Sequence, residues 1–171
     1  MLPNPVHPAV VHFPLVLMIL LPIAAGVALA AIRRGARLRM AWAVPVAFSA
    51  ALAASAWLAL ETGEDQEEKV EQIVPRTALE AHADAAEAFL IASGVLFLVT
   101  AAGLAGGPVG RAARWTSTLG ALVVVAMGVR VGDAGGKLVY QHGAAMAYTS
   151  GSGAHPARPA EGREGQPGEG P

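Results

Sequence analysis

Four long apolar segments separated by short polar stretches dominate the chain. They run from Phe13 to Ile32, from Met40 to Leu60, from Ala88 to Ala105 and from Trp115 to about Val131, and each is nearly free of charge. A helix rises about 1.5 Å per residue, so each segment is long enough to cross a hydrocarbon layer of about 30 Å. Backbone groups in lipid need hydrogen-bond partners within the protein, which makes such segments helical, and the sequence lacks the short alternating strands of a membrane barrel. The pattern predicts an all-α integral membrane protein, a four-helix bundle.

We expect helices over about residues 8–32, 40–60, 77–105 and 114–134, within one transmembrane domain of residues 1–148. Pro8 suits a first helical turn, whereas Pro14 and Pro22 each remove a backbone donor and predict kinks. The stretch from Thr77 to Glu80 has the pattern of a capping box, which would start the third helix at Thr77. Residues 149–171 are rich in Gly and Pro and cannot form a core, so they are expected to be a disordered tail.

The charges predict how the helices are oriented in the membrane. Six arginines, with no acid among them, lie in the linkers after the first and third segments: Arg33, Arg34, Arg37, Arg39, Arg111 and Arg114. Basic linkers stay in the cytoplasm, and the segment from Glu61 to Glu87, with nine acids against two bases, then lies outside. Both termini are therefore predicted outside. Trp42 and Trp115 would lie at the inner membrane boundary and Trp57 near the outer one.

The composition supports this interpretation and removes several classes of function. The chain is 54% hydrophobic and 15% charged, with a mean hydropathy of +0.47. A cleaved signal peptide is the competing interpretation of the first segment, but arginines follow that segment and none precedes it, the reverse of a secretory signal. The absence of cysteine excludes disulfides, c-type haem attachment and thiolate metal sites. No nucleophile motif, phosphate-binding glycine loop or nucleic-acid surface is present.

Two patterns predict how the helices pack. Gly128, Gly132 and Gly136 are spaced by four residues, as expected for two helices in close contact. In the third helix, one stripe at 100° per residue faces the other helices, while Glu80, Asp84 and Glu87 lie on roughly the opposite face. The members of that stripe are His82, Ala86, Phe89, Ser93, Leu96 and Thr100.

The predicted topology brings histidines from three separate helix ends to one face of the membrane. These are His7, His12, His82 and His142, joined by Glu61, Thr62, Arg130 and Asp133; His155 lies in the tail and is expected to be idle. His7 and His12 are five residues apart and point about 140° away from each other on a helix, so they are no ligand pair by themselves. An interfacial histidine often only bonds a loop carbonyl, and four together are harder to explain in that way.

Several short motifs resemble a known family. HPAVVHFP at the start, the TG of ETGED, the histidine of EAHADAA and the terminal GGKLVYQHG are similar to motifs of the bacterial predicted membrane proteins grouped as domain of unknown function 2231. The resemblance covers roughly Pro5 to Ala145. It implies a four-helix inner-membrane protein. Members of this family are sometimes found beside or fused to cytochrome c or rhodanese-like modules. The resemblance therefore implies a redox neighbourhood but no established activity.

Three hypotheses follow for the histidine cluster. In the favoured one the protein is a haem b or redox-associated subunit, with His12 and His82 as axial ligands, His142 as a substitute, and Arg130 or Lys137 pairing with propionates. In the second, zinc or copper is bound by His7, His12, His82 and His142 with a carboxylate from Glu61 or Asp84.

In the third, the protein is a non-catalytic assembly subunit whose outer acidic face docks a periplasmic redox protein or which joins a membrane oligomer. No independent enzymatic activity is expected under any of the three. A proton-coupled carrier is a weaker alternative, because Asp133 is the only acid inside a span.

Overall fold

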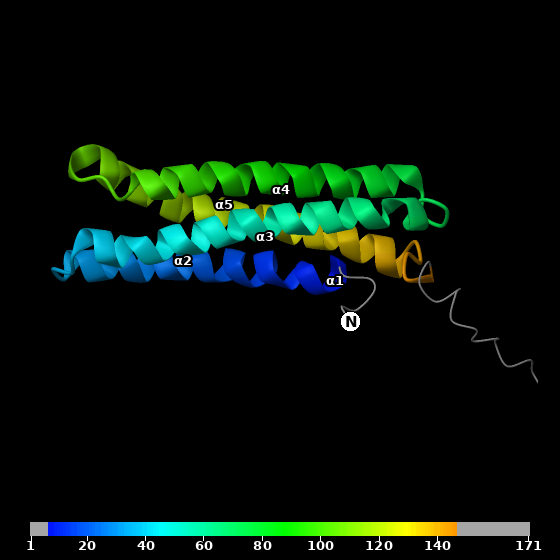
Figure 1. Ribbon diagram of the computed structural model, residues 1–171, viewed down its shortest axis with the longest axis horizontal. Helices are drawn as coiled ribbons and strands as arrows, with labels where there is room; N and C mark the ends of the chain where they lie inside the picture. Colours follow the sequence, from blue (N-terminus) through cyan, green and yellow to red (C-terminus); the bar gives the residue numbers. More distant parts are fainter. Residues whose placement is uncertain (1–6, 147–171) are drawn as a thin grey trace, which may run out of the picture.

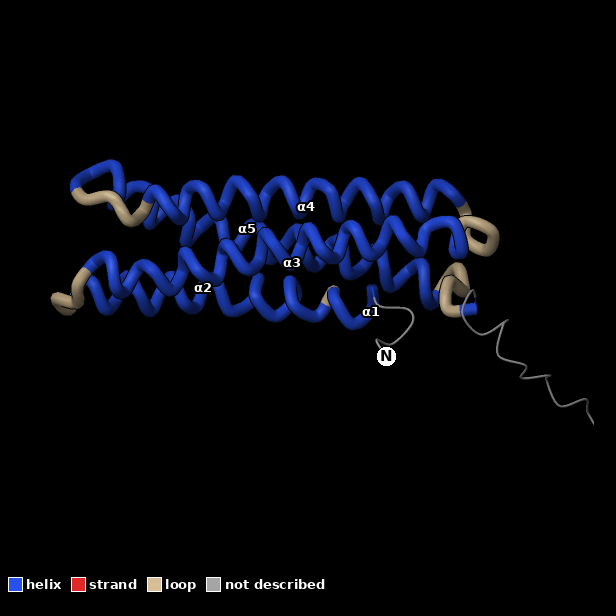
Figure 2. The backbone as a smooth tube through the Cα atoms, in the orientation of Figure 1, coloured by secondary structure: helices blue, strands red, loops and turns tan. Residues whose placement is uncertain are grey.

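The chain is an all-helical bundle in the computed structural model, which describes residues 7–146, with only the backbone described for residues 65–69. The elements are α1 (His7–Val10), α2 (His12–Arg33), α3 (Leu38–Val70), α4 (Arg76–Ala102) and α5 (Gly107–Tyr140). Between residues 7 and 146 the chain forms only helices and turns (Figure 2). The predicted tail of residues 149–171 and His155 lie outside the described residues.

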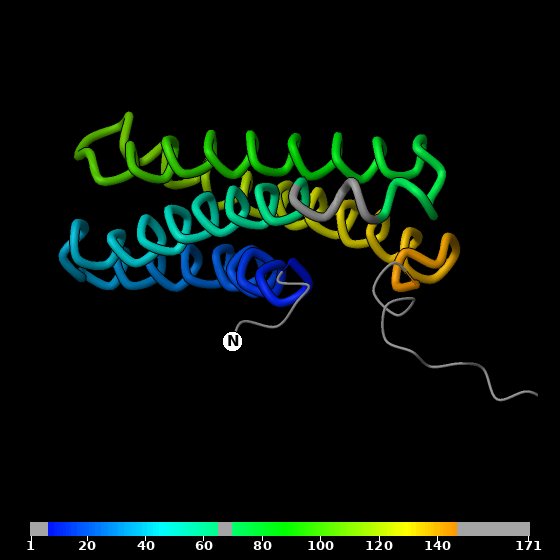
Figure 3. The backbone as a smooth tube through the Cα atoms, turned by 45° about the vertical axis from the view of Figure 1, so that its right-hand side comes forward, coloured from blue at the N-terminus to red at the C-terminus, as the bar shows by residue number. Residues whose placement is uncertain are grey.

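The four long helices run up and down and lie side by side (Figures 1 and 3). α2 packs mainly on α3 and α5, and α4 mainly on α3 and α5, so each helix has two principal neighbours. The first and last described residues lie at the same end of the bundle, on the right in Figure 1. The α2–α3 and α4–α5 turns lie at the opposite end, together with the six arginines predicted to be there.

All four long helices are apolar and long enough to cross a membrane. The candidate spans are His7–Arg33, Leu38–Glu64, Arg76–Ala102 and Gly107–Tyr140. Their outer surfaces carry large apolar side chains that no other part of the described chain covers, for example Phe13, Val27, Leu98 and Val129. Such surfaces are expected of a bundle whose solvent is lipid, because lipid tails are as apolar as the side chains themselves.

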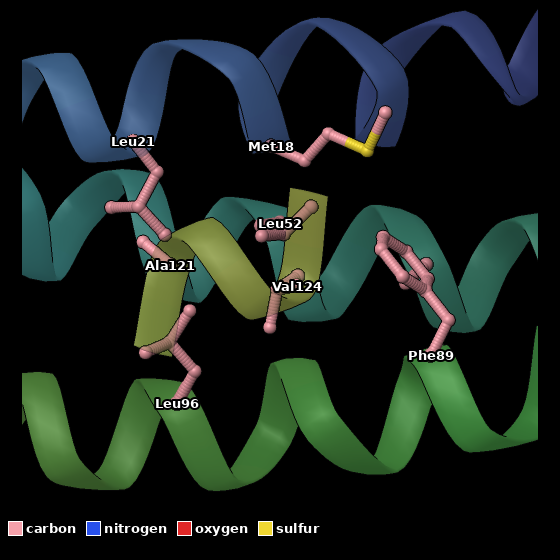
Figure 4. Packing of buried hydrophobic residues seen from close by; sticks show 8 residues of the cluster. Met18, Leu21, Leu52, Phe89, Leu96, Ala121 and Val124 are labelled. Atoms are coloured by element: carbon pink, nitrogen blue, oxygen red, sulfur yellow. The ribbon is translucent and has the colours of Figure 1, made fainter. Parts of the chain in front are cut away.

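Packing at the centre of the bundle draws on all four long helices. Met18 and Leu21 of α2, Leu52 of α3, Phe89 and Leu96 of α4, and Ala121 and Val124 of α5 point toward one another (Figure 4). The predicted stripe of α4 is confirmed, since Phe89, Ser93, Leu96 and Thr100 are buried, His82 and Ala86 are half-buried, and Glu80, Asp84 and Glu87 are exposed. The helical period alone therefore placed His82 on the inner side.

The first helical segment is interrupted once, at Val11 between α1 and α2, in the turn that precedes Pro14. The amide of Val11 still donates to the His7 carbonyl and that of Leu15 to the Val11 carbonyl. Pro14 has no N–H to give to Val10, so the backbone hydrogen bonds are interrupted here. Pro22 lies inside α2, which continues through it. Val11 itself keeps helical dihedral angles, so the interruption affects the hydrogen bonds of this turn.

Two helices are longer than their apolar segments. α3 continues through the acidic stretch to Val70, where we expected a loop with short helical turns, and α5 begins at Gly107 instead of 114 and ends at Tyr140 instead of 134. Glu, Lys, Gln and Arg are good helix formers, so a helix can continue into polar sequence beyond the apolar segment. Hydropathy therefore predicts the length of the membrane span but not the length of the helix.

The predicted capping box at the start of α4 was wrong. The N-cap is Pro75, with no side-chain cap, and the helix begins at Arg76. Glu80 instead accepts a hydrogen bond from Arg76 at 2.8 Å, one turn away on an exposed face.

The arginine end, which we define by Arg33, Arg34, Arg37, Arg39, Arg111 and Arg114, is held by two buried side chains. Trp42 is fully buried and its indole N–H donates to the Thr100 carbonyl at 2.8 Å, so its predicted place in an interfacial aromatic belt was wrong. Arg114 is also buried and donates to the carbonyls of Gly103 and Ala105. Backbone carbonyls at a helix C-terminus lack intrahelical donors. Trp42 and Arg114 donate hydrogen bonds to carbonyls at the C-terminal end of α4 and in the turn that follows it.

The predicted glycine stripe of α5 is confirmed at one of its three positions, Gly128. Gly128 packs against Met18 and Phe89, but a side chain at Gly132 or Gly136 would meet nothing within 4 Å. The second close contact is instead at Gly135, seven residues after Gly128, against His82. A spacing of seven residues keeps both glycines on the face toward the bundle.

Candidate functional site

Two half-buried histidines come together at the end of the bundle opposite the arginines. His7 begins α1, which packs on α3, and His82 lies in the second turn of α4. Both are half-buried, and their rings lie close enough to interact electrostatically. We call this region, with Thr62, Gly63 and Gly135, the histidine end.

His7 is fixed by the last apolar turn of α3. Its Nδ1 lies 3.2 Å from the Thr62 hydroxyl oxygen, and that hydroxyl is 2.9 Å from the Leu58 carbonyl and 3.1 Å from the Ala59 carbonyl. The hydroxyl proton is directed to these carbonyls, so the oxygen accepts a hydrogen bond from Nδ1–H of His7. In the tautomer with the proton on Nδ1, the lone pair of the neutral ring is on Nε2. Ligand histidines are typically held in this manner.

His82 has an unused nitrogen. Its Nδ1 is buried and has no hydrogen-bond partner among the described residues. The other polar neighbour of the ring is the backbone of Val131 on α5, and in the tautomer with the proton on Nε2 the lone pair lies on Nδ1. A buried polar atom without a partner costs free energy and calls for an explanation, such as a bound ion, water or ligand.

Two glycines let the imidazole rings approach the helix backbones. A Cβ at Gly63 would lie 3.2 Å from Cε1 of His7, and one at Gly135 would lie 3.1 Å from Cε1 of His82. Any larger residue would push the rings away from these helices. These positions were missed in the search for site residues. The sequence carried a signal for both positions: Gly63 lies in the TG motif and Gly135 in the GGK motif, and each motif is near a helix end that bears a histidine.

The other predicted site residues lie outside this pair. His12 is exposed on α2, and His142 is half-buried in the turn after α5, where its amide donates to the Lys137 carbonyl. Glu61 and Arg130 are exposed. Within residues 7–146, leaving aside the side chains of 65–69, no three His, Cys, Asp or Glu side chains are grouped so as to hold a metal ion.

The surroundings of the pair are acidic. A groove of about 370 Å³ between α3 and α4 is lined by apolar residues and by Glu64, Asp84 and Glu87, and Glu64 directly follows Gly63. Asp133 does not pair with Arg130 but lies 2.7 Å from Nζ of Lys137, one turn away on α5. The carboxylates of this end are thus displayed on the surface, away from the imidazoles.

Comparison with known proteins identifies the family. No curated protein and no solved structure matches the chain. A family model described as a predicted membrane protein, DUF2231, matches residues 3–148, which include all five helices and both histidines. The chain belongs to the DUF2231 family of predicted membrane proteins.

Proposed function

We propose that this protein is a cofactor-holding membrane subunit in which His7 and His82 ligate one metal centre, haem b iron in the first place. The observation that carries the proposal is the buried Nδ1 of His82, which has no hydrogen-bond partner among the described residues and lies near a second imidazole, that of His7. Two imidazoles from two different helices can act together as a donor set, because imidazole is a common metal ligand.

The number of donors favours haem over a bare ion. Haem iron brings four equatorial nitrogens of its own and needs at most two axial ligands, which helices of a bundle supply from facing sides. Zinc is almost always four-coordinate, and the described residues offer two imidazoles here without a third His, Cys, Asp or Glu. In place of the expected axial pair of His12 and His82, the geometry favours His7 and His82.

The remaining predicted residues fit as supporting groups. Arg130 and Lys137 flank Gly135 on α5 and are the cations expected to meet haem propionates, Lys137 in exchange for its present partner Asp133. His142 follows α5 at the same end and is the substitute ligand. We place the histidine end outside a bacterial inner membrane, because the arginine end carries the positive charge expected of a cytoplasmic face. A periplasmic redox protein would then meet the acidic surface beside the histidine pair.

The proposal is tested by cofactor content. The protein is produced with haem available and purified in detergent as wild type, His7→Ala, His82→Ala and His12→Ala. The first two variants should lose bound haem, because each removes one of two axial ligands. His12→Ala removes a histidine of the same helical segment whose side chain is exposed, and should keep it.

Elemental analysis of the same samples distinguishes the alternatives. If the wild-type protein contains stoichiometric zinc or copper and no haem, and this metal content falls in His7→Ala and His82→Ala, then the same site binds a bare ion instead of haem. Wild-type protein with neither haem nor metal would contradict the proposal and favour the assembly subunit. Circular dichroism of each variant separates loss of ligand from loss of fold.

A further inference from the structure

One arginine of the arginine end lies over an aromatic ring on the outside of the bundle. The guanidinium carbon of Arg33, at the last residue of α2, is 5.2 Å from the centre of the Trp115 ring on α5. Both side chains are exposed, and Trp115 is 43% accessible. A cation at this distance over an indole face is attracted by the ring, and a stacked guanidinium keeps its N–H edge free.

The arginines of this end have no acidic partner among the residues that the structure describes. No Asp or Glu occurs in residues 1–60 or 88–132, which include the helix ends and turns of the arginine end. Arg33 makes no hydrogen bond or ion pair within residues 7–146, and the two ion pairs found there are Arg76 with Glu80 and Lys137 with Asp133, both elsewhere. Of the six arginines, Arg114 is occupied with carbonyls, so five exposed cations face outward without an anion.

A second arginine and an apolar track complete the surface. Arg111 is one turn before Trp115, so the two share a face of α5, and Arg111 is exposed. Leu119 and Leu122 follow on the same face toward the middle of the span and are 60% and 55% exposed. Along α5 the order is therefore cation, indole, apolar side chains, which is the order of headgroup, interface and hydrocarbon in a bilayer.

We propose that Arg33, Trp115 and Arg111 form a binding site for the phosphate headgroup of an anionic phospholipid, with an acyl chain along Leu119 and Leu122. A phosphodiester supplies the missing anion and accepts the paired N–H groups of a guanidinium. Basic surfaces at the membrane boundary attract anionic lipid by about fivefold for each arginine near the headgroups. The site is independent of any cofactor at the histidine end.

The test uses fluorescence quenching by brominated lipid. Trp57→Phe protein, which keeps Trp115 and the buried Trp42, is reconstituted in vesicles of phosphatidylcholine and phosphatidylglycerol, with bromine on the chains of one lipid or of the other. Bromine on phosphatidylglycerol should quench Trp115 several-fold more effectively than bromine on phosphatidylcholine. The Arg33→Gln and Arg111→Gln variants in this background should each reduce the preference by about fivefold.

The Arg39→Gln variant is the matched control, because it removes one exposed charge from the same end without touching Trp115. It should keep most of the preference. Arg33→Lys should give an intermediate value, since it keeps the charge but loses the planar stack. Equal quenching by the two brominated lipids before any arginine is replaced would overturn the proposal, and so would an effect of Arg39→Gln as large as that of Arg33→Gln.

Discussion

The two ends of the bundle treat buried polar groups in opposite ways. At the arginine end, the indole N–H of Trp42 and the guanidinium of Arg114 both donate to backbone carbonyls near the end of α4. At the histidine end, His7 has one partnered nitrogen and the buried Nδ1 of His82 has none. A satisfied buried polar group stabilises a fold, whereas an unsatisfied one destabilises it unless a ligand binds. The comparison separates an end whose buried polar side chains are satisfied from the end for which we propose a ligand.

The largest effect is expected at the arginine end. Trp42→Ala removes a fully buried side chain and leaves a cavity, so it should lower the free energy of unfolding by about 3–5 kcal/mol. Trp57→Ala, at a site 52% exposed, should change it by less than about 1 kcal/mol. Unfolding by sodium dodecyl sulfate in mixed micelles, followed by circular dichroism, measures both. Equal losses would show that Trp42 is not part of the core.

Arg114 should come next. Arg114→Ala leaves the carbonyls of Gly103 and Ala105 without their donor and should cost about 2–3 kcal/mol of unfolding free energy. Arg111→Ala, three residues earlier and exposed, should stay within about 0.5 kcal/mol of wild type in the same titration. A loss at Arg111 equal to that at Arg114 would mean that charge, and not the hydrogen bonds, holds this turn.

Thr62→Val tests the histidine end with little effect on the fold. The substitution keeps the shape of the side chain but removes the oxygen that accepts from Nδ1–H of His7. Outer-shell partners of this kind are worth about 10–100-fold in ligand affinity, so haem titration should show a loss in that range. Thr118→Val is the control, because Thr118 also bonds a backbone carbonyl, at 2.7 Å, but far from the histidines. Unchanged affinity in Thr62→Val would remove His7 from the donor set.

The smallest effect is expected from the glycines of α5. An alanine at Gly135 would press on the His82 ring, whereas one at Gly132 would meet nothing within 4 Å. Gly135→Ala should weaken haem binding by less than about fivefold, the low end of an overpacking penalty, and Gly132→Ala should leave it unchanged. If Gly132→Ala were the more harmful variant, the regular four-residue stripe would be the packing face after all.

Hydropathy and helical period predicted the fold well and the site incompletely. The charge-free segments predicted the four long helices, because a segment that crosses a bilayer has to be long and apolar. The period of 3.6 residues predicted that His82 faces the bundle, because this period follows from helix geometry. Trp42 was misplaced because an indole near a helix end suits both a membrane boundary and a core, and only the tertiary contact with Thr100 decides between them.

The choice between His7 and His12 needed a tertiary contact that periodicity does not contain. The helical period placed the two histidines about 140° apart but did not say which of them faces the bundle, and His12 was favoured as a ligand. In the structure His7 contacts Thr62 of α3 and His12 is exposed. Likewise, the glycine of α5 that contacts His82 is Gly135, and a search for spacings of four residues passes over it.

The most direct test of the histidine pair is the reduced-minus-oxidised visible spectrum of wild type, His7→Ala and His12→Ala produced with haem available. The geometry predicts the sharp bands of six-coordinate haem b in wild type and in His12→Ala, and their loss in His7→Ala. A featureless wild-type spectrum, or bands that survive in His7→Ala and vanish in His12→Ala, would contradict the assignment of His7 and His82 as the ligand pair.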